Sequence, residues 1–152
     1  MENIIVALSN FPSIYPIYLS LHFNDFYTFA SLAFVSFWSI VSHLLENHKH
    51  GMPGLGNSKK ISYLTNRLDV LGCGLIISRI CYLYYYKYGH SINPVIENKY
   101  LVIGLLMPII LLQISEYDKY NSKRKCVYII FHSMWHITAF YSLGIFLKSF
   151  IY

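Results

Sequence analysis

The chain has 152 residues, of which 55% are hydrophobic and only 12% are charged. An ordinary soluble domain carries about 25% charged residues, so a soluble fold of this length would lack the polar side chains needed to cover its surface. The formal net charge is +5, but the Lys and Arg residues are spread between apolar runs and do not form the basic stripe of a nucleic-acid-binding protein. The composition therefore predicts an all-α, polytopic transmembrane helix bundle without a nucleic-acid partner, formed as one domain by residues 1–152.

Five apolar segments are predicted to span the membrane, in the approximate ranges 4–21, 26–45, 61–86, 100–115 and 126–147. The second and fifth contain no Asp, Glu, Lys or Arg, and a helix of about 20 residues crosses a hydrocarbon core of about 30 Å. The first segment contains Pro12 and Pro16, and the fourth contains Pro108. Membrane helices tolerate proline where neighbouring groups satisfy the freed carbonyl, so both segments are predicted to span, the first as a short, kinked helix.

The segments between these spans predict the orientation of the chain. The region 46–60 is marked as a turn by Gly51, Pro53, Gly54 and Gly56. Basic residues concentrate in the second and fourth loops, which hold Lys49, Lys59, Lys60, Lys119, Lys123, Arg124 and Lys125, whereas the first and third hold only Lys87 and Lys99. By the positive-inside rule, the N-terminus is expected on the cytoplasmic side and the C-terminus outside.

Polar residues inside the apolar segments are the strongest functional signal, because an ionisable group in a membrane span is costly and suggests a role by default. His132 and His136 are separated by one helical turn, so both imidazoles lie on one helix face and can share a metal ion. This HxxxH spacing alone is weak evidence. Ser39 lies one turn before a third imidazole, that of His43, on the second span. Arg79 is expected near the opposite membrane face, snorkelling beside the tyrosines that follow it.

Alternating spans place these groups at one depth. His43 lies near the C-terminal end of the second span, Asp69 lies in the N-terminal part of the third, and His132 lies seven residues past Lys125, so all three border the same membrane face. Three histidines and a carboxylate match a catalytic zinc site with an open position for water. We therefore expect zinc ligation by His43, His132 and His136. Zinc lowers the pKa of bound water to about 7, Asp69 would orient that water or act as general base, and Ser39 would hydrogen-bond the water or the developing oxyanion.

Other interpretations compete with this one. A single membrane histidine more often bonds to a neighbouring helix than to a metal. Facing histidines also ligate haem in electron-transfer proteins, and a metal site in a non-enzymatic membrane factor can simply hold helices together. Gly72 and Gly74, beside Asp69, are expected to let helices approach closely. The remaining histidines fall in predicted loops, where an exposed imidazole is expected to have no specific role: His22, His48, His50 and His90. Of these, His48 and His50 are considered as auxiliary metal ligands.

The order Ser39-x3-His43, Asp69, His132-x3-His136 resembles the CREST superfamily of membrane hydrolases, which includes alkaline ceramidases and adiponectin receptors. Within it the chain is similar to the branch of myomaker and the GPI-directed lipases, through Ser42-His43, Gly51-Met-Pro-Gly54, Asn66-Arg-Leu-Asp69 and His132-Ser-Met-Trp-His136. The resemblance covers roughly residues 5–75 and 126–147.

This resemblance implies zinc held by the three histidines, with Ser39 and Asp69 around the bound water. It also implies that the substrate is a membrane lipid, cleaved at an amide or ester bond. The superfamily has seven spans and this chain offers about five. Because the difference is two spans, the last helix still begins at the same membrane face and the site can still form there. The shortened bundle is then a minimal enzyme, a homo-oligomer that completes its cavity wall, or a degenerate relative.

Overall fold

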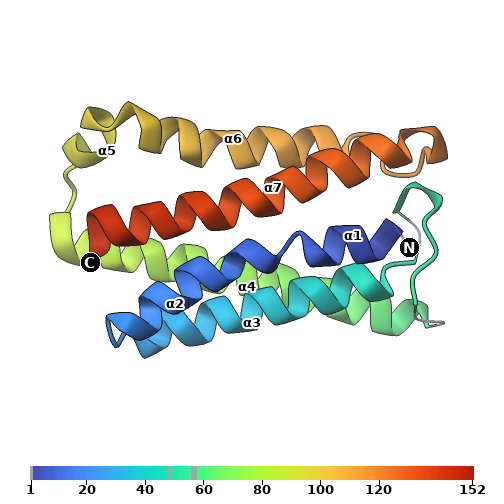
Figure 1. The fold of residues 1–152 in the computed structure, drawn as a ribbon, viewed down its shortest axis with the longest axis horizontal. Helices are drawn as coiled ribbons and strands as arrows, with labels where there is room; N and C mark the ends of the chain where they lie inside the picture. Colours follow the sequence, from blue (N-terminus) through green and yellow to red (C-terminus); the bar gives the residue numbers. More distant parts are fainter. Residues whose placement is uncertain (1, 48, 56–57) are drawn as a thin grey trace.

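The computed structural model describes residues 2–47, 49–55 and 58–152, apart from the side chains of residues 49, 100 and 101. The expected turn residue Gly56 and the candidate auxiliary ligand His48 lie outside the described residues. Within the described ranges all regular elements are helical. The α-helices are α1 (Glu2–Leu8), α2 (Ile14–His22), α3 (Phe26–Leu45), α4 (Lys59–Tyr88), α5 (Asn93–Glu97), α6 (Lys99–Glu116) and α7 (Lys125–Phe146), and the chain ends in a short π-helix, η4 (Leu147–Ile151). Apart from the short α5, they lie along one common long axis (Figure 1).

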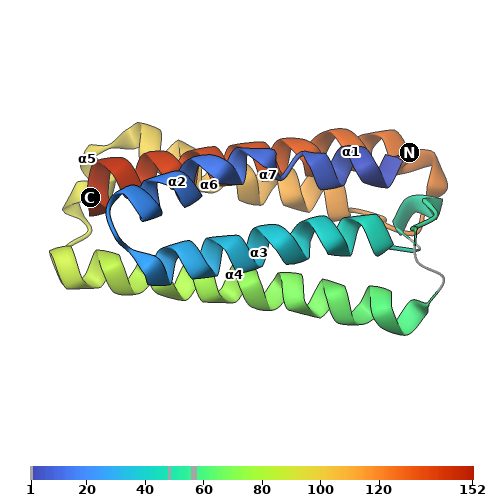
Figure 2. The ribbon, with the colours of Figure 1, turned by 60° about the horizontal axis from the view of Figure 1, so that its bottom comes forward.

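The first helical segment is broken near its middle. α1 and α2 are separated by a short 3-10 helix, η1 (Phe11–Ser13), which contains Pro12. A proline cannot donate a backbone hydrogen bond, so a break there is expected. α2 then packs closely on α7, where a Cβ at Gly144 would collide with the ring of Tyr15. Figure 2 shows the broken segment lying along α7 and above α3.

α3 and α4 form a closely packed pair. Asp25 caps the start of α3, with its Oδ1 accepting the backbone N–H of Thr28 at 3.0 Å. A Cβ at Gly72 would lie 2.8 Å from Val35, so the missing side chain lets α4 approach α3. The prediction that Gly74 also lets two helices approach closely is wrong, because a Cβ there would meet nothing within 4 Å.

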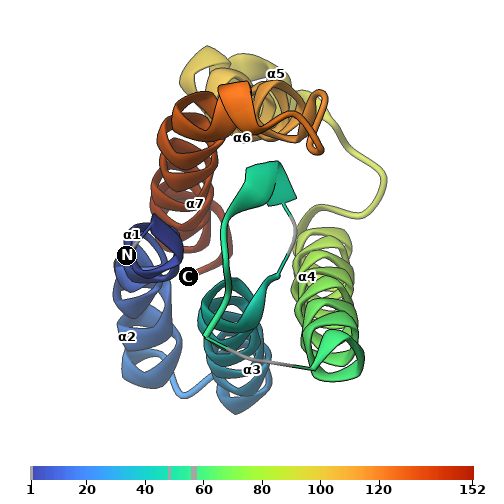
Figure 3. The same ribbon diagram turned by 90° about the vertical axis from the view of Figure 1, so that its right-hand side faces the viewer.

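The helices assemble as two pairs joined by the N-terminal segment. α3 packs along α4, and α6 packs along α7, while α1 and α2 contact both α3 and α7. Viewed from the end where the N-terminus lies, the segment after α3 crosses in front of the space between the two pairs (Figure 3). The main core cluster connects α3, α4, α7 and the C-terminal turn through Leu32, Val35, Ile76, Phe140 and Leu147.

The outer surface of the bundle is strongly apolar. Among the residues that the structure describes, four helical segments are long and apolar enough to cross a membrane: Glu2–His22, Phe26–Leu45, Lys59–Tyr88 and Ser122–Ile151. The part of α6 at Val102–Glu116 is a shorter apolar helix. Large apolar side chains are exposed on every one of these helices, for instance Phe37, Ile77 and Ile109. Apolar exposure on this scale is rare on soluble monomers and typical of surfaces that contact lipid or a partner.

Candidate metal centre

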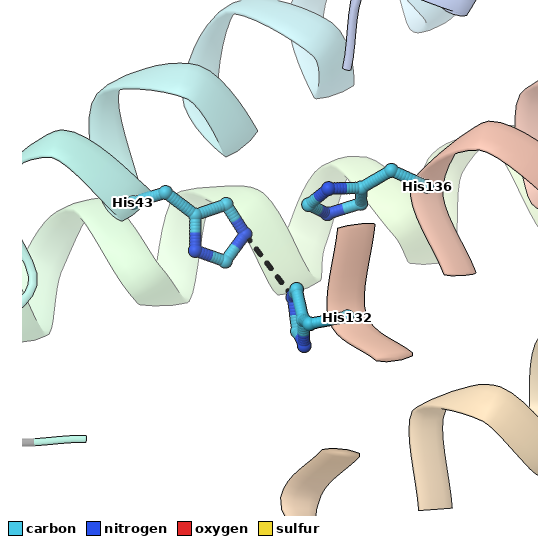
Figure 4. Close-up of side chains that lie close together, drawn as sticks. All are labelled: His43, His132 and His136. Carbon is cyan, nitrogen blue, oxygen red and sulfur yellow. Dashed lines mark hydrogen bonds between the residues drawn. The ribbon is translucent and has the colours of Figure 1, made fainter. Parts of the chain in front are cut away.

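Three histidines meet between the two helix pairs, near the end of the bundle that carries the N-terminus. His43 comes from the last turn of α3, and His132 and His136 come from successive turns of α7. The Nε2 atoms of His43 and His132 are 3.3 Å apart, and one ring nitrogen from each of the three residues lies within 4.8 Å of the others. All three side chains are at most 4% exposed. Figure 4 shows the three rings turned toward a common point.

This spacing fits a metal ion. Nitrogen ligands at 2.0 to 2.1 Å from a tetrahedral zinc ion are separated from one another by about 3.3 to 3.4 Å. The distance between His43 and His132 falls at that value, and His136 completes a set of three nitrogens. A hydrogen bond between two histidines would explain one close pair, but it would not explain the third imidazole. The three buried histidines are therefore close enough to bind one metal ion.

The hydrogen bonds behind the rings select which nitrogen faces the centre. The Ser9 hydroxyl lies 2.6 Å from the carbonyl oxygen of Val6 and 2.7 Å from Nδ1 of His136. A carbonyl oxygen can only accept, so the single hydroxyl proton of Ser9 goes to Val6 and its oxygen accepts from Nδ1–H of His136. Nε2 of His136 is then the unprotonated nitrogen and the candidate ligand atom for a metal.

The same logic applies to His132. The Ser115 hydroxyl donates to the carbonyl oxygen of Leu112 at 2.8 Å and lies 3.2 Å from Nδ1 of His132. An oxygen of the Glu116 carboxylate is 3.3 Å from the same nitrogen. Both groups accept, so Nδ1 carries the proton and Nε2 is left for a metal.

A carboxylate also stands behind the third ring. An oxygen of Glu46, the residue that directly follows α3, lies 3.5 Å from Nδ1 of His43. The buried Tyr128 hydroxyl donates to the same Glu46 oxygen at 3.2 Å. The Tyr128 ring also packs against His132, with ring centroids 4.7 Å apart. Acceptors on the Nδ1 side of each imidazole are the usual companions of histidine metal ligands.

A cavity of about 1180 Å³ opens beside the histidines. Its polar end is lined by the three histidines together with Ser39, Asp69 and Asn10. Ser39 and Asp69, the two residues predicted to act on water, are buried, with 2% and 7% of their surface exposed. The cavity continues along α4, α6 and α7 between apolar side chains that include Ile76, Ile80, Leu105, Ile109, Phe140 and Phe146. The structure thus brings Ser39 and Asp69 to the same cavity as the three histidines.

The segment after α3 closes this end of the bundle. Asn3 donates to the carbonyl oxygens of Glu46 and Pro53, at 2.9 and 3.3 Å. The backbone N–H of His50 donates to the carbonyl oxygen of Lys119. Sequence reasoning expected His50 to be an exposed loop residue, and this was wrong: only 1% of its surface is exposed. Its ring packs against Tyr128 in a tilted arrangement, with centroids 4.9 Å apart, and no local sequence signal indicates this contact.

Arg79 lies away from the histidines, as expected from its place on α4. Its guanidinium pairs with Asp25 at 2.8 Å and donates to the Thr28 hydroxyl at 3.2 Å. It also lies over the rings of Tyr27 and Tyr82. Burial favours the neutral acid of Asp25, but the hydrogen bonds from Thr28 and the charge of Arg79 hold its pKa below 3.8. Sequence reasoning placed Arg79 beside tyrosines but missed its partner Asp25.

Comparison with known proteins gives a relative without an assigned activity. An uncharacterized protein of Acanthamoeba polyphaga mimivirus is 52% identical over 152 residues, which cover 100% of each chain. No protein-family model and no solved structure matches this chain. These comparisons assign no activity to the site.

Proposed function

This chain belongs to the family of the mimivirus protein, and we propose that it is a membrane-embedded, zinc-dependent hydrolase that cleaves an amide or ester bond of a membrane lipid. The observation that carries the proposal is the convergence of three imidazole nitrogens at the polar end of a large, mostly apolar cavity. The order of Ser39, His43, Asp69, His132 and His136 supports it, because it is similar to the zinc-site pattern of CREST hydrolases.

His43, His132 and His136 would hold the zinc ion. When bound, zinc acts as a Lewis acid and lowers the pKa of a coordinated water to about 7. Asp69 is the candidate general base, taking a proton from the attacking water and returning it to the leaving amine or alcohol. Ser39 would donate a hydrogen bond to the oxyanion that forms at the carbonyl. Three protein ligands would leave one coordination position open, which is typical of catalytic rather than structural zinc.

The cavity favours a lipid substrate. Its walls beyond the site are apolar and belong to helices whose outer faces are apolar as well. Ligand cavities typically measure about 300 to 1,000 Å³, so this one is large enough for an acyl chain. In this proposal four or five helices span the bilayer, and the end carrying the site faces the cytoplasm, as the Lys and Arg residues of the neighbouring loops suggest.

A second candidate is a non-enzymatic membrane factor, for remodelling or fusion, in which the metal only holds helices together. One observation favours it: His43 belongs to the α3–α4 pair, whereas His132 and His136 belong to the α6–α7 pair. A shared metal ion would therefore tie the two pairs to each other. Metal binding alone consequently does not separate the two candidates.

The test uses the protein purified in detergent, with zinc measured by elemental analysis and fatty acid release measured on a total membrane lipid extract. We expect near-stoichiometric zinc and fatty acid release for the wild type. Asp69→Asn should retain zinc and lose release, while Asp118→Asn, at an exposed turn residue, should retain both. Zinc that persists after His43, His132 and His136 are all replaced by Ala would refute the site. Zinc without lipid turnover in either the wild type or Asp69→Asn would favour the structural role.

A further inference from the structure

The apolar part of the cavity ends far from the histidines, near the opposite end of the bundle. Its lining residues there are Tyr84, in the last part of α4, Val95 of α5, and Phe146, the last residue of α7. Phe146 is buried, and its ring lies beside that of Tyr84, with centroids 6.3 Å apart. We refer to these three side chains as the cavity floor.

A second layer of side chains supports the floor from behind. The ring of Phe150, in η4, stacks on Phe146 with centroids 5.6 Å apart, and Phe150 is itself buried. The ring of Tyr88 lies 5.0 Å from that of Tyr84, and its hydroxyl donates to the carbonyl oxygen of Phe150 at 3.0 Å. A molecule that extended past the floor would therefore have to displace packed rings.

The chain segments that carry these two layers are tied to α4. The Tyr84 hydroxyl donates to the carbonyl oxygen of Ser91, just before α5, at 2.8 Å. The Lys87 ammonium donates to the carbonyl oxygen of Ile151 at 2.9 Å. Apart from Phe146, the residues of both layers lie outside the ranges of the CREST resemblance. The floor is therefore built by this chain's own α5 and η4 and is not part of the histidine motif.

The length of the apolar section follows from the rise of the helices. His136 and Phe146 are ten residues apart on α7, which corresponds to about 15 Å along the helix. Asp69 and Tyr84 are fifteen residues apart on α4, which corresponds to about 22 Å. An extended hydrocarbon chain advances by about 1.25 Å per carbon, because its C–C bonds of about 1.5 Å zigzag. The section between the histidines and the floor therefore accommodates about 12 to 18 carbons.

We propose that Tyr84, Val95 and Phe146 are specificity-determining residues that limit the acyl chain of the substrate to about 12 to 18 carbons. This inference rests on the proposed function and specifies the substrate of the same site. With the scissile carbonyl at the metal centre, the acyl chain runs along α7 and its methyl end meets the floor. The headgroup then stays at the polar end of the cavity.

The selection should appear as a cut-off and not as a gradual trend with chain length. Lipid tails are as apolar as the side chains of a membrane protein, so a carbon that fits the cavity gains little relative to the bilayer. A carbon beyond the floor overpacks the rings behind it, which is expected to weaken binding by about 5- to 150-fold. We therefore expect a 22-carbon chain to bind at least about tenfold more weakly than a 14-carbon chain.

The experiment uses the protein in lipid nanodiscs loaded with equal amounts of saturated fatty acids of 14, 18 and 22 carbons. Native mass spectrometry measures the fatty acids that stay bound. The wild type should retain the 14-carbon acid at least about tenfold over the 22-carbon acid. Phe146→Ala lowers the floor and should bring this ratio close to one. Val95→Phe raises the floor and should reduce retention of the 18-carbon acid relative to the 14-carbon acid.

A matched control separates the length of the cavity from its width. Ile109 lines the α6 wall between the histidines and the floor. Ile109→Ala widens the cavity there without lengthening it, so the ratio of 14- to 22-carbon acid should stay at the wild-type value. A ratio in Ile109→Ala that falls as far as in Phe146→Ala would overturn the role of the floor.

The remaining outcomes are distinct from one another. Equal retention of the 14- and 22-carbon acids by the wild type, or retention of neither, would overturn the inference. Equal retention would mean that the chain leaves sideways between α4 and α6, which pack on α3 and α7 and not closely on each other. An unchanged ratio of 18- to 14-carbon acid in Val95→Phe would also overturn it, even if Phe146→Ala failed to fold. Selective retention by a wild type that releases no fatty acid from a membrane lipid extract would refute the hydrolase and leave the length limit standing.

Discussion

Ser9→Ala removes the hydrogen-bond acceptor that holds the His136 ring with Nε2 directed at the metal centre. The Ser9 oxygen is 2.7 Å from Nδ1 of His136, and both residues are buried. A buried N–H that loses its acceptor costs about 1 to 3 kcal/mol. If this cost falls on the metal-bound state, zinc affinity drops by about 5- to 150-fold, since each 1.4 kcal/mol is a factor of ten. Removing such partners of zinc-bound histidines typically costs 10- to 100-fold.

The measurement is a zinc competition titration against a chromophoric chelator, with the protein in detergent and its helicity checked by circular dichroism. Ser115→Ala is the matched control. It removes a comparable hydroxyl 3.2 Å from Nδ1 of His132, but the Glu116 carboxylate remains 3.3 Å from the same nitrogen. We therefore expect a clearly smaller loss for Ser115→Ala. Wild-type affinity in Ser9→Ala, or a larger loss in Ser115→Ala, would refute the assignment of Nε2 as the ligand atom.

Two further predictions concern the scaffold. Gly72→Ala places a Cβ 2.8 Å from Val35 and should destabilise the protein by about 1 to 3 kcal/mol. Gly74→Ala meets open space and should be neutral or stabilising by up to about 1 kcal/mol. Denaturant titration of both variants measures these effects, and equal effects would contradict the close packing of α3 on α4. The lowered pKa of Asp25 means that its contribution to stability is fully present above pH 3.8 and is lost as the pH falls through its lower folded-state pKa. Asp25→Asn should therefore lower the melting temperature at neutral pH, and the deficit should shrink below pH 3.8; a deficit independent of pH would show that the charge pair with Arg79 contributes nothing.

The helical fold and the grouping of the histidines were predictable because both depend on short-range rules. Segments of about 20 residues without charge predict long apolar helices, and the structure has such helices. The i, i+4 spacing of His132 and His136 puts both on one helix face. An even number of intervening crossings brings His43 to the same end of the bundle, and the three side chains do meet there.

The residues that orient the histidines were not predictable, because they lie far from their partners in the sequence. Ser9 is 127 residues from His136, and the contact depends on how the N-terminal segment packs on α7. The prediction that His50 is exposed was wrong for a similar reason, since its burial depends on contacts with the segment at 119–121 and with Tyr128. The two glycines of α4 differ only in which helix face they occupy, which a small-residue pattern does not reveal when the neighbouring helix is unknown.

The balance between a catalytic and a purely structural metal depends on the groups that a structural site would not need. A metal that only ties α3 to α7 is served by three histidines and their Nδ1 partners, and a fourth protein ligand would make it more stable. Here the space beside the three nitrogens is instead a cavity that is lined by Asp69, Ser39 and Asn10. Burying a carboxylate, a hydroxyl and a carboxamide in an apolar bundle costs free energy that a structural role does not recover. Hydrolysis gives Asp69 and Ser39 defined tasks, which is why we favour the enzyme.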